Sequence, residues 1–139
     1  MTEIKKINHV AVVVENLEEA LVFWEGQLGL ELDHVETVES MSVRIAFLPV
    51  GDSEIELVEP TAEDTGTARF LRDRGPGMHH LCLEVNNLEN KLKELAEKGV
   101  DLIHEVPEEM EDGRLLAFVH PRSSGGVLLE LYQLPEDKQ

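Results

Sequence analysis

Two histidines and two glutamates of this sequence could together bind a divalent metal ion. His9 and His80 each begin a run of alternating residues, HVAVVV and HLCLEV. Glu56 and Glu130 stand in two shorter runs, IELV and LELY. Imidazole and carboxylate groups coordinate Co²⁺, Mn²⁺, Ni²⁺ and Zn²⁺, and four such ligands leave two octahedral positions for water or a chelating substrate. We therefore predict a metal site that is open to a small ligand.

Strand alternation places these four side chains opposite their apolar neighbours. Successive side chains of a β-strand point to opposite faces, so each of the four lies on the face away from the predicted helices. His79 has the other parity, and we expect it to pack or hydrogen-bond at the start of its strand. A solvated sheet face would explain either glutamate alone. It would not explain one histidine and one glutamate at equivalent places in each half of the chain.

The two halves of the chain repeat one pattern. HVAVVVENLEEAL, from His9, matches HLCLEVNNLENKL, from His80, at an offset of 71 residues, which holds as far as AF at 46–47 and 117–118. The offset becomes 74 residues where IELV meets LELY, because the second copy has three extra residues in its HPRSSGG turn. We interpret the chain as two diverged copies of one module.

Each module is predicted to contain a strand, a helix and three more strands. The first strand covers about 7–14 or about 78–85, and Asn16 or Asn87 follows it as a helix N-cap. Leucines at helical spacing then predict a helix in each copy. The later strands are predicted at LELDHVE, SVRIAFLP and SEIELVEP in the first copy, and at DLIHEVP, RLLAFVHP and GVLLELYQLP in the second. Between the copies, TGTARFLRDRGPG predicts a short helix and a turn.

This pattern predicts an α+β fold of two tandem βαβββ modules. The length of 139 residues suits one compact domain, so we expect a single domain over residues 1–139. Its modules are expected at about 5–62 and about 76–135, joined by the short helical linker.

Composition limits the partners that the chain can have. A formal net charge of −17 argues against nucleic acid, and an anionic ligand would need a metal ion or a local arginine to hold it. The single cysteine, Cys82, cannot form an internal disulfide. The sequence has neither a secretory signal segment nor an apolar run of membrane-spanning length, so we expect a cytoplasmic protein without a membrane partner.

These modules resemble the vicinal-oxygen-chelate superfamily, which includes glyoxalase I, ring-cleaving dioxygenases and methylmalonyl-CoA epimerases. Within it, the chain is similar to the epimerases along almost its whole length. The segments GMHH and HPRSSGGVLLEL discriminate best, since glyoxalase I usually has a DPDG type of turn in the second place. The other matching segments are NHVAVVVENLEEALVFWEGQLGLEL, VRIAFLPVGDSEIELVEP and ARFLRDRGPGMHHLCLEVNNLE. The resemblance implies a curved mixed sheet around a metal-binding cavity, and a homodimer.

The resemblance also implies a site and a reaction. It assigns the metal ligands to His9, Glu56, His80 and Glu130, with Co²⁺ as the expected ion and Mn²⁺, Ni²⁺ or Zn²⁺ as alternatives. The substrate would be an acyl-CoA, and the reaction would be epimerisation of (R)- and (S)-methylmalonyl-CoA by proton transfer at the α-carbon. A metal-stabilised enolate would be the intermediate. Proton removal on one face and return on the other requires two acid/base groups, and the resemblance nominates Glu130 as one catalytic residue.

The second acid/base group is not identified by the resemblance. Some epimerases carry a glutamate on the strand that aligns with SVRIAF, but the matching residue here is Arg44. An arginine cannot act as a base at neutral pH. Glu56 or a bound water could serve instead. Arg44 itself could bind the free carboxylate of the substrate, or it could form a structural salt bridge.

Two other functions stay open at this stage. A glyoxalase I (lactoylglutathione lyase)-like isomerase would use the same ligands for proton transfer on a glutathione hemithioacetal. A non-catalytic module could instead sequester an apolar drug. The complete set of two histidines and two glutamates argues against the non-catalytic module, because such proteins typically lack part of it.

Overall fold

The computed structural model describes residues 2–136, which divide into two compact units. One unit comprises residues 9–79, and the other comprises residues 2–8 and 80–136. Strands β1 (Ile4–Val13) and β5 (Gly77–Val85) each contribute residues to both units. The predicted domain of residues 1–139 includes residues 1 and 137–139, which lie outside the described part. That single domain, with modules at about 5–62 and 76–135, stays a prediction.

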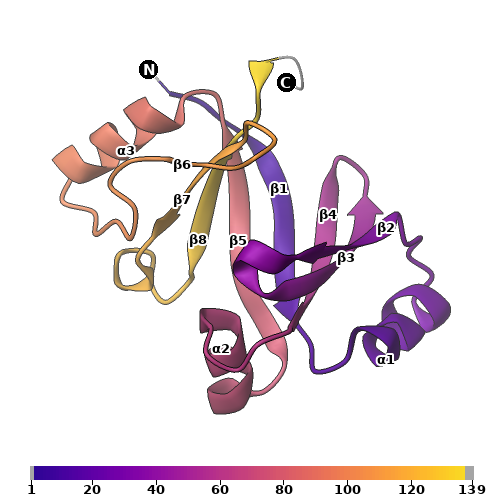
Figure 1. Ribbon diagram of the computed structural model, residues 1–139. Coiled ribbons are helices and arrows are strands. Elements are labelled where there is room, and N and C mark those ends of the chain that lie inside the picture. The colour runs from indigo at the N-terminus through magenta and orange to yellow at the C-terminus, as the bar shows by residue number, and fades with distance from the viewer. Residues whose placement is uncertain (1, 137–139) are drawn as a thin grey trace. The chain divides into compact units, whose positions relative to one another are not determined.

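The unit of residues 9–79 contains the first predicted βαβββ module from residue 9 onward, and the linker helix. Its strands are hydrogen-bonded in the order β2-β3-β4-β1, in which β4 is parallel to β1 and the other neighbours are antiparallel. After β1 the elements are α1 (Leu17–Leu21), a π-helical segment (Val22–Gln27), β2 (His34–Val38), a 3-10 turn (Glu39–Met41), β3 (Val43–Val50), β4 (Ser53–Pro60) and α2 (Gly66–Arg74) (Figure 1).

Helix α1 starts at the predicted N-cap and covers one face of these strands. The Asn16 side chain accepts a hydrogen bond from Glu19 N, at 2.8 Å. Leu17 is buried against Leu57 and Leu48 of the strands. The predicted helix continues beyond α1 in π-helical form, where Leu28 N donates to the carbonyl oxygen five residues earlier. The opposite face buries another apolar cluster: Ala11, Val13, Val43 and Val58, packed against Phe70 and Leu71 of α2.

The unit of residues 2–8 and 80–136 has the same arrangement of a parallel strand pair and an asparagine-capped helix. Its strands are hydrogen-bonded in the order β1-β5-β8-β7-β6, with β8 parallel to β5, and α3 (Leu88–Glu97) packs against β7 and β8 (Figure 1). Asn87 caps α3 by accepting from Asn90 N, at 3.0 Å. Leu88 and Leu92 of α3 are buried against the sheet. After β5 the elements are α3 (Leu88–Glu97), β6 (Glu108–Glu109), β7 (Leu115–Val119), a 3-10 turn (Pro121–Ser123) and β8 (Leu129–Gln133).

Two of the predicted strands are placed differently in the structure. Residues 101–107 carry only one isolated bridge, between Leu102 and Val119, and the short strand β6 follows them. Here the His104 ring accepts a hydrogen bond from Phe118 N, at 3.0 Å. In a regular strand pair, a backbone carbonyl of the neighbouring strand would accept that bond. In the first module the LELDHVE strand begins only at His34. Within residues 2–136, no helix combines the length and apolar character that crossing a membrane requires.

Candidate active site

The first histidine and glutamate of the predicted set form a buried pair in the unit of residues 9–79. Ala11 on β1 lies opposite Glu56 on β4, and His9 is two residues before Ala11, so its side chain shares the face of Ala11. His9 Nδ1 lies 3.2 Å from Glu56 Oε2. His9 is 1% exposed and Glu56 is 7% exposed, so the pair is almost inaccessible to solvent.

The second histidine and glutamate form an equivalent pair in the unit of residues 2–8 and 80–136. Cys82 on β5 lies opposite Glu130 on β8, and His80 is two residues before Cys82. His80 Nε2 lies 3.0 Å from Glu130 Oε1, and the Glu130 residue is 4% exposed. The His80 ring also meets Phe118 edge-on, with 5.5 Å between ring centroids.

The strand partners of the two glutamates correspond as well. Phe47 lies opposite Glu56 on β3, just as Phe118 lies opposite Glu130 on β7. A buried carboxylate is costly unless a polar or charged group compensates it, and an imidazole stands beside each one here. Imidazole nitrogen and carboxylate oxygen are also ligands that divalent transition metals accept. Each pair is therefore chemically suited to supply two ligands to a divalent ion.

His79 packs at the start of its strand, as its parity predicts. Its ring meets Phe70 of α2 edge-on, with a centroid distance of 5.0 Å. Arg74 of the same helix places its guanidinium carbon 5.5 Å from the centroid of the Phe70 ring. His79 is thus part of the contact that holds α2 against the first module.

Arg44 lies on a different face of the first module from Glu56. It shares the parity of Ala46 and Leu48, which pack under α1. Its guanidinium forms ion pairs with Glu59 Oε1, at 3.0 Å, and with Glu18 Oε2, at 2.7 Å. Hydrogen bonding between Arg44 and Glu18 raises the pKa of the arginine and lowers the pKa of the glutamate. This arrangement favours the structural salt bridge over substrate binding, and the role of Arg44 in binding stays a prediction.

The face that carries Glu130 also holds polar residues to which the sequence analysis gave no role. Cys82 is fully buried, and its sulfur lies within 4.8 Å of a Glu130 carboxylate oxygen. Glu84 is buried next along β5, where Asn8 Nδ2 donates to it at 3.2 Å and Lys5 Nζ lies 3.8 Å away. Tyr132 lies two residues beyond Glu130 on β8. Strand alternation, applied beyond the histidines and glutamates of the predicted site, would have identified these positions.

Comparisons with known proteins place the chain in a family. The sequence profile of the Glyoxalase/Bleomycin resistance protein/Dioxygenase superfamily matches residues 8–118. Methylmalonyl-CoA epimerase of Bos taurus mitochondria is 36% identical over 129 residues, which cover 92% of this chain and 74% of that protein. The Bacillus subtilis protein YqjC, to which no activity has been assigned, is 35% identical over 96% of this chain and 95% of its own.

Solved structures support the same relationship. A methylmalonyl-CoA epimerase in complex with methylmalonyl-CoA and NH4⁺ superimposes with a TM-score of 0.85 and 28% sequence identity. The match covers 96% of this chain and 97% of the epimerase. The predicted α+β fold of paired βαβββ modules is therefore confirmed.

Proposed function

The chain belongs to the Glyoxalase/Bleomycin resistance protein/Dioxygenase superfamily, and we propose that it is a metal-dependent methylmalonyl-CoA epimerase. One observation carries this proposal. A histidine lies about 3 Å from a buried glutamate at equivalent places in each unit, 3.2 Å for His9 and Glu56 and 3.0 Å for His80 and Glu130. The similarity to named epimerases over more than nine tenths of the chain supplies the substrate class.

All four side chains would hold one divalent ion. Such an ion supplies Lewis-acid stabilisation of the negative charge that develops on the substrate oxygens when the α-proton is removed. His9 and His80 are neutral donors and Glu56 and Glu130 are anionic ones, so the set offsets the charge of a divalent cation. Co²⁺ remains the ion that we expect first, with Mn²⁺, Ni²⁺ and Zn²⁺ as alternatives.

Glu130 would also transfer the proton. Its carboxylate is held at the His80 imidazole and is buried, so a proton taken from the substrate would be shielded from bulk water. Epimerisation requires the proton to return on the opposite face of the carbon, which takes a second acid/base group. Glu56 and a bound water are the candidates. The acyl-CoA substrate, the homodimer and the cytoplasmic location complete the proposal.

An enzyme assay with metal removal and readdition tests the proposed function. Epimerisation of methylmalonyl-CoA is coupled to methylmalonyl-CoA mutase, so that only one epimer is consumed directly. We expect activity with the purified protein, loss of activity with a chelator that is removed before the assay, and recovery when Co²⁺ is restored. A parallel assay with the glutathione hemithioacetal tests the glyoxalase I alternative. Turnover of the hemithioacetal without epimerisation would refute the epimerase proposal.

A further inference from the structure

Arg114 lies on the same face as Glu130 in the unit of residues 2–8 and 80–136, here called the second unit. It directly precedes β7, on which side chains alternate, so Arg114 shares its parity with Leu116 and Phe118. Phe118 lies opposite Glu130 and Leu116 lies opposite Tyr132. This face forms a cluster of its own with Cys82, Leu116 and Tyr132, separate from the cluster under α3.

Two neighbours hold the Arg114 guanidinium in place. Its carbon lies 5.2 Å from the centroid of the Tyr132 ring, and its Nη1 donates to the Tyr132 hydroxyl at 3.3 Å. Asp112 Oδ2 also lies 2.8 Å from Arg114 Nε. Tyr132 is two residues from Glu130 on β8, which puts their Cα atoms about 7 Å apart. Arg114 is thus anchored on Tyr132, which is the next residue after Glu130 on the same face of β8.

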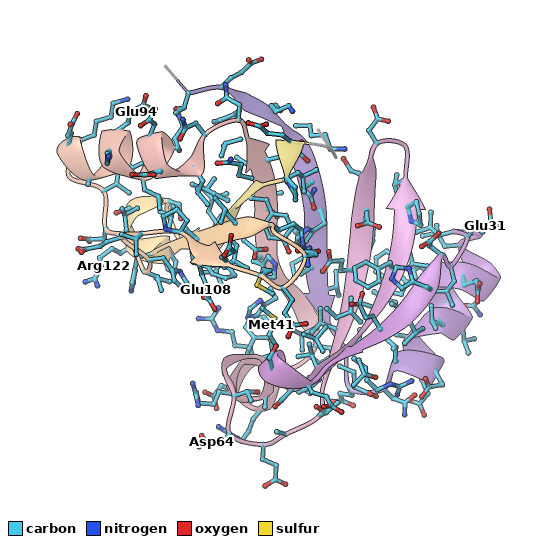
Figure 2. All side chains as sticks on the ribbon, turned by 45° about the horizontal axis from the view of Figure 1, so that its top comes forward. Glu31, Met41, Asp64, Glu94, Glu108 and Arg122 are labelled. Carbon is cyan, nitrogen blue, oxygen red and sulfur yellow. The ribbon has the colours of Figure 1, made fainter. Side chains whose placement is uncertain are left out.

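A cation on the face of Glu130 would favour binding of an anionic substrate to this acidic chain. With a formal net charge of −17, the chain repels an anionic substrate unless local groups compensate. Besides Arg114, the described part of the second unit contains one arginine, Arg122, which is labelled in Figure 2. Arg122 lies in the Pro121–Ser123 turn and pairs with Asp101. Arg44, in the other unit, pairs with Glu18 and Glu59.

We propose that Arg114 binds an anionic group of the acyl-CoA substrate, with Asp112 and Tyr132 as residues that position its guanidinium. The inference rests on the proposed epimerase function and extends it to the substrate contacts. A planar guanidinium binds carboxylate and phosphate oxygens through paired hydrogen bonds. The anionic group is the free carboxylate of the acyl chain or a phosphate of coenzyme A. The Arg114 side chain is 32% exposed, so part of it is accessible to such a ligand while Asp112 holds it at Nε.

Calorimetric titration of the metal-loaded protein with two acyl-CoA ligands tests the proposal. Methylmalonyl-CoA carries both anionic groups, whereas propionyl-CoA carries only the phosphates. We expect Arg114→Gln to weaken binding of methylmalonyl-CoA by about 10-fold or more, since charge-assisted hydrogen bonds are lost. Unchanged binding of propionyl-CoA would identify the carboxylate as the partner of Arg114. Equal weakening of both would identify a phosphate.

Arg122→Gln is the matched control, because it removes the same charge from an exposed turn outside this face. We expect its affinities to equal those of the wild type. Tyr132→Phe removes only the hydroxyl, and we expect a smaller loss of affinity than with Arg114→Gln. Melting temperatures establish that each variant is folded. If Arg114→Gln folds and binds both ligands as tightly as Arg122→Gln does, the proposal is refuted.

Binding and turnover together separate this proposal from the proposed function. A wild-type protein that binds methylmalonyl-CoA without epimerising it would refute the epimerase function and would still allow the role of Arg114 to be measured. A wild-type protein that binds neither acyl-CoA would overturn both proposals. In an active enzyme, we expect Arg114→Gln to raise KM and to change kcat little, because the lost contact binds the ground state and the transition state equally.

Discussion

The Nε2 atom of His80 lies 3.0 Å from Oε1 of Glu130, on a neighbouring parallel strand and fifty positions further along the chain. His79, next to it in sequence, instead packs edge-on against Phe70 of α2. Strand alternation separates the two histidines, because adjacent side chains point to opposite faces. His79 packs against helix α2, and His80 lies beside the buried carboxylate of Glu130.

The two adjacent histidines should therefore differ in their effect on metal binding. We expect His80→Ala to lose most of its bound metal, because one of four proposed ligands is removed, while His79→Ala keeps about one ion per chain. Metal analysis of both purified variants by mass spectrometry measures this. His79→Ala should instead lower the melting temperature, since its contact with Phe70 disappears. Equal metal loss in the two variants would contradict the proposed ligand set.

Replacing Glu130 should remove proton exchange. In deuterated water, the wild type is expected to incorporate deuterium at the α-carbon of methylmalonyl-CoA. Glu130→Gln should slow this exchange by about 10²- to 10⁴-fold, the usual contribution of a general acid or base. Nuclear magnetic resonance of the recovered substrate gives the rate, and metal analysis shows whether the variant still binds its ion. Full exchange in a metal-loaded variant would place the acid/base group elsewhere.

Several features of the fold and the site could be read directly from the sequence. The parity of a strand depends only on its alternation, so the opposite faces of His79 and His80 were predictable. Helix caps are equally local, and Asn16 and Asn87 both accept hydrogen bonds from residues three positions later. The duplication then related the glutamate of one module to the glutamate of the other.

Other features depend on pairings that the sequence does not reveal. The segment DLIHEVP at 101–107 was predicted as a strand, but the His104 ring accepts the hydrogen bond from Phe118 N that a strand partner would accept. The face of Arg44 depends on its register with Glu59 of β4 and on the position of α1. The sequence around Arg114 did not predict its contact with Tyr132, because that contact depends on how β7 pairs with β8.

Replacing Cys82 tests whether its thiol belongs to the metal ligands. Its sulfur lies near Glu130, and a thiolate would be a competent ligand for zinc or cobalt. Because we assign the four ligands to histidines and glutamates, Cys82→Ser and Cys82→Ala should both retain one ion per chain. The absorption spectrum of the cobalt-loaded wild type should also lack a thiolate-to-cobalt charge-transfer band. Such a band, lost in Cys82→Ser, would add the thiol to the ligands.

Arg44→Gln distinguishes the two roles considered for that residue. Its contacts with Glu18 and Glu59 predict that the variant melts at a lower temperature and keeps the KM of the wild type. Direct contact with the substrate carboxylate predicts a KM raised by about 10-fold, the effect of losing a charge-assisted hydrogen bond. Steady-state kinetics and thermal unfolding of one variant measure both quantities. A raised KM would restore substrate binding as the function of Arg44.

The pH dependence of stability should report the ion pair between Arg44 and Glu18. Arg44 hydrogen-bonds the Glu18 carboxylate and lowers its pKa below the usual 4.5 in the folded protein. A lowered folded-state pKa means that the pair stabilises the protein above the unfolded pKa, and that this stabilisation is lost as the pH falls through the folded pKa. The difference in unfolding free energy between wild type and Arg44→Gln should therefore shrink on acidification below about pH 4.5. In carbon-detected titrations, Arg44→Gln should raise the pKa of Glu18, whereas an unchanged pKa would show that the pair does not persist in solution.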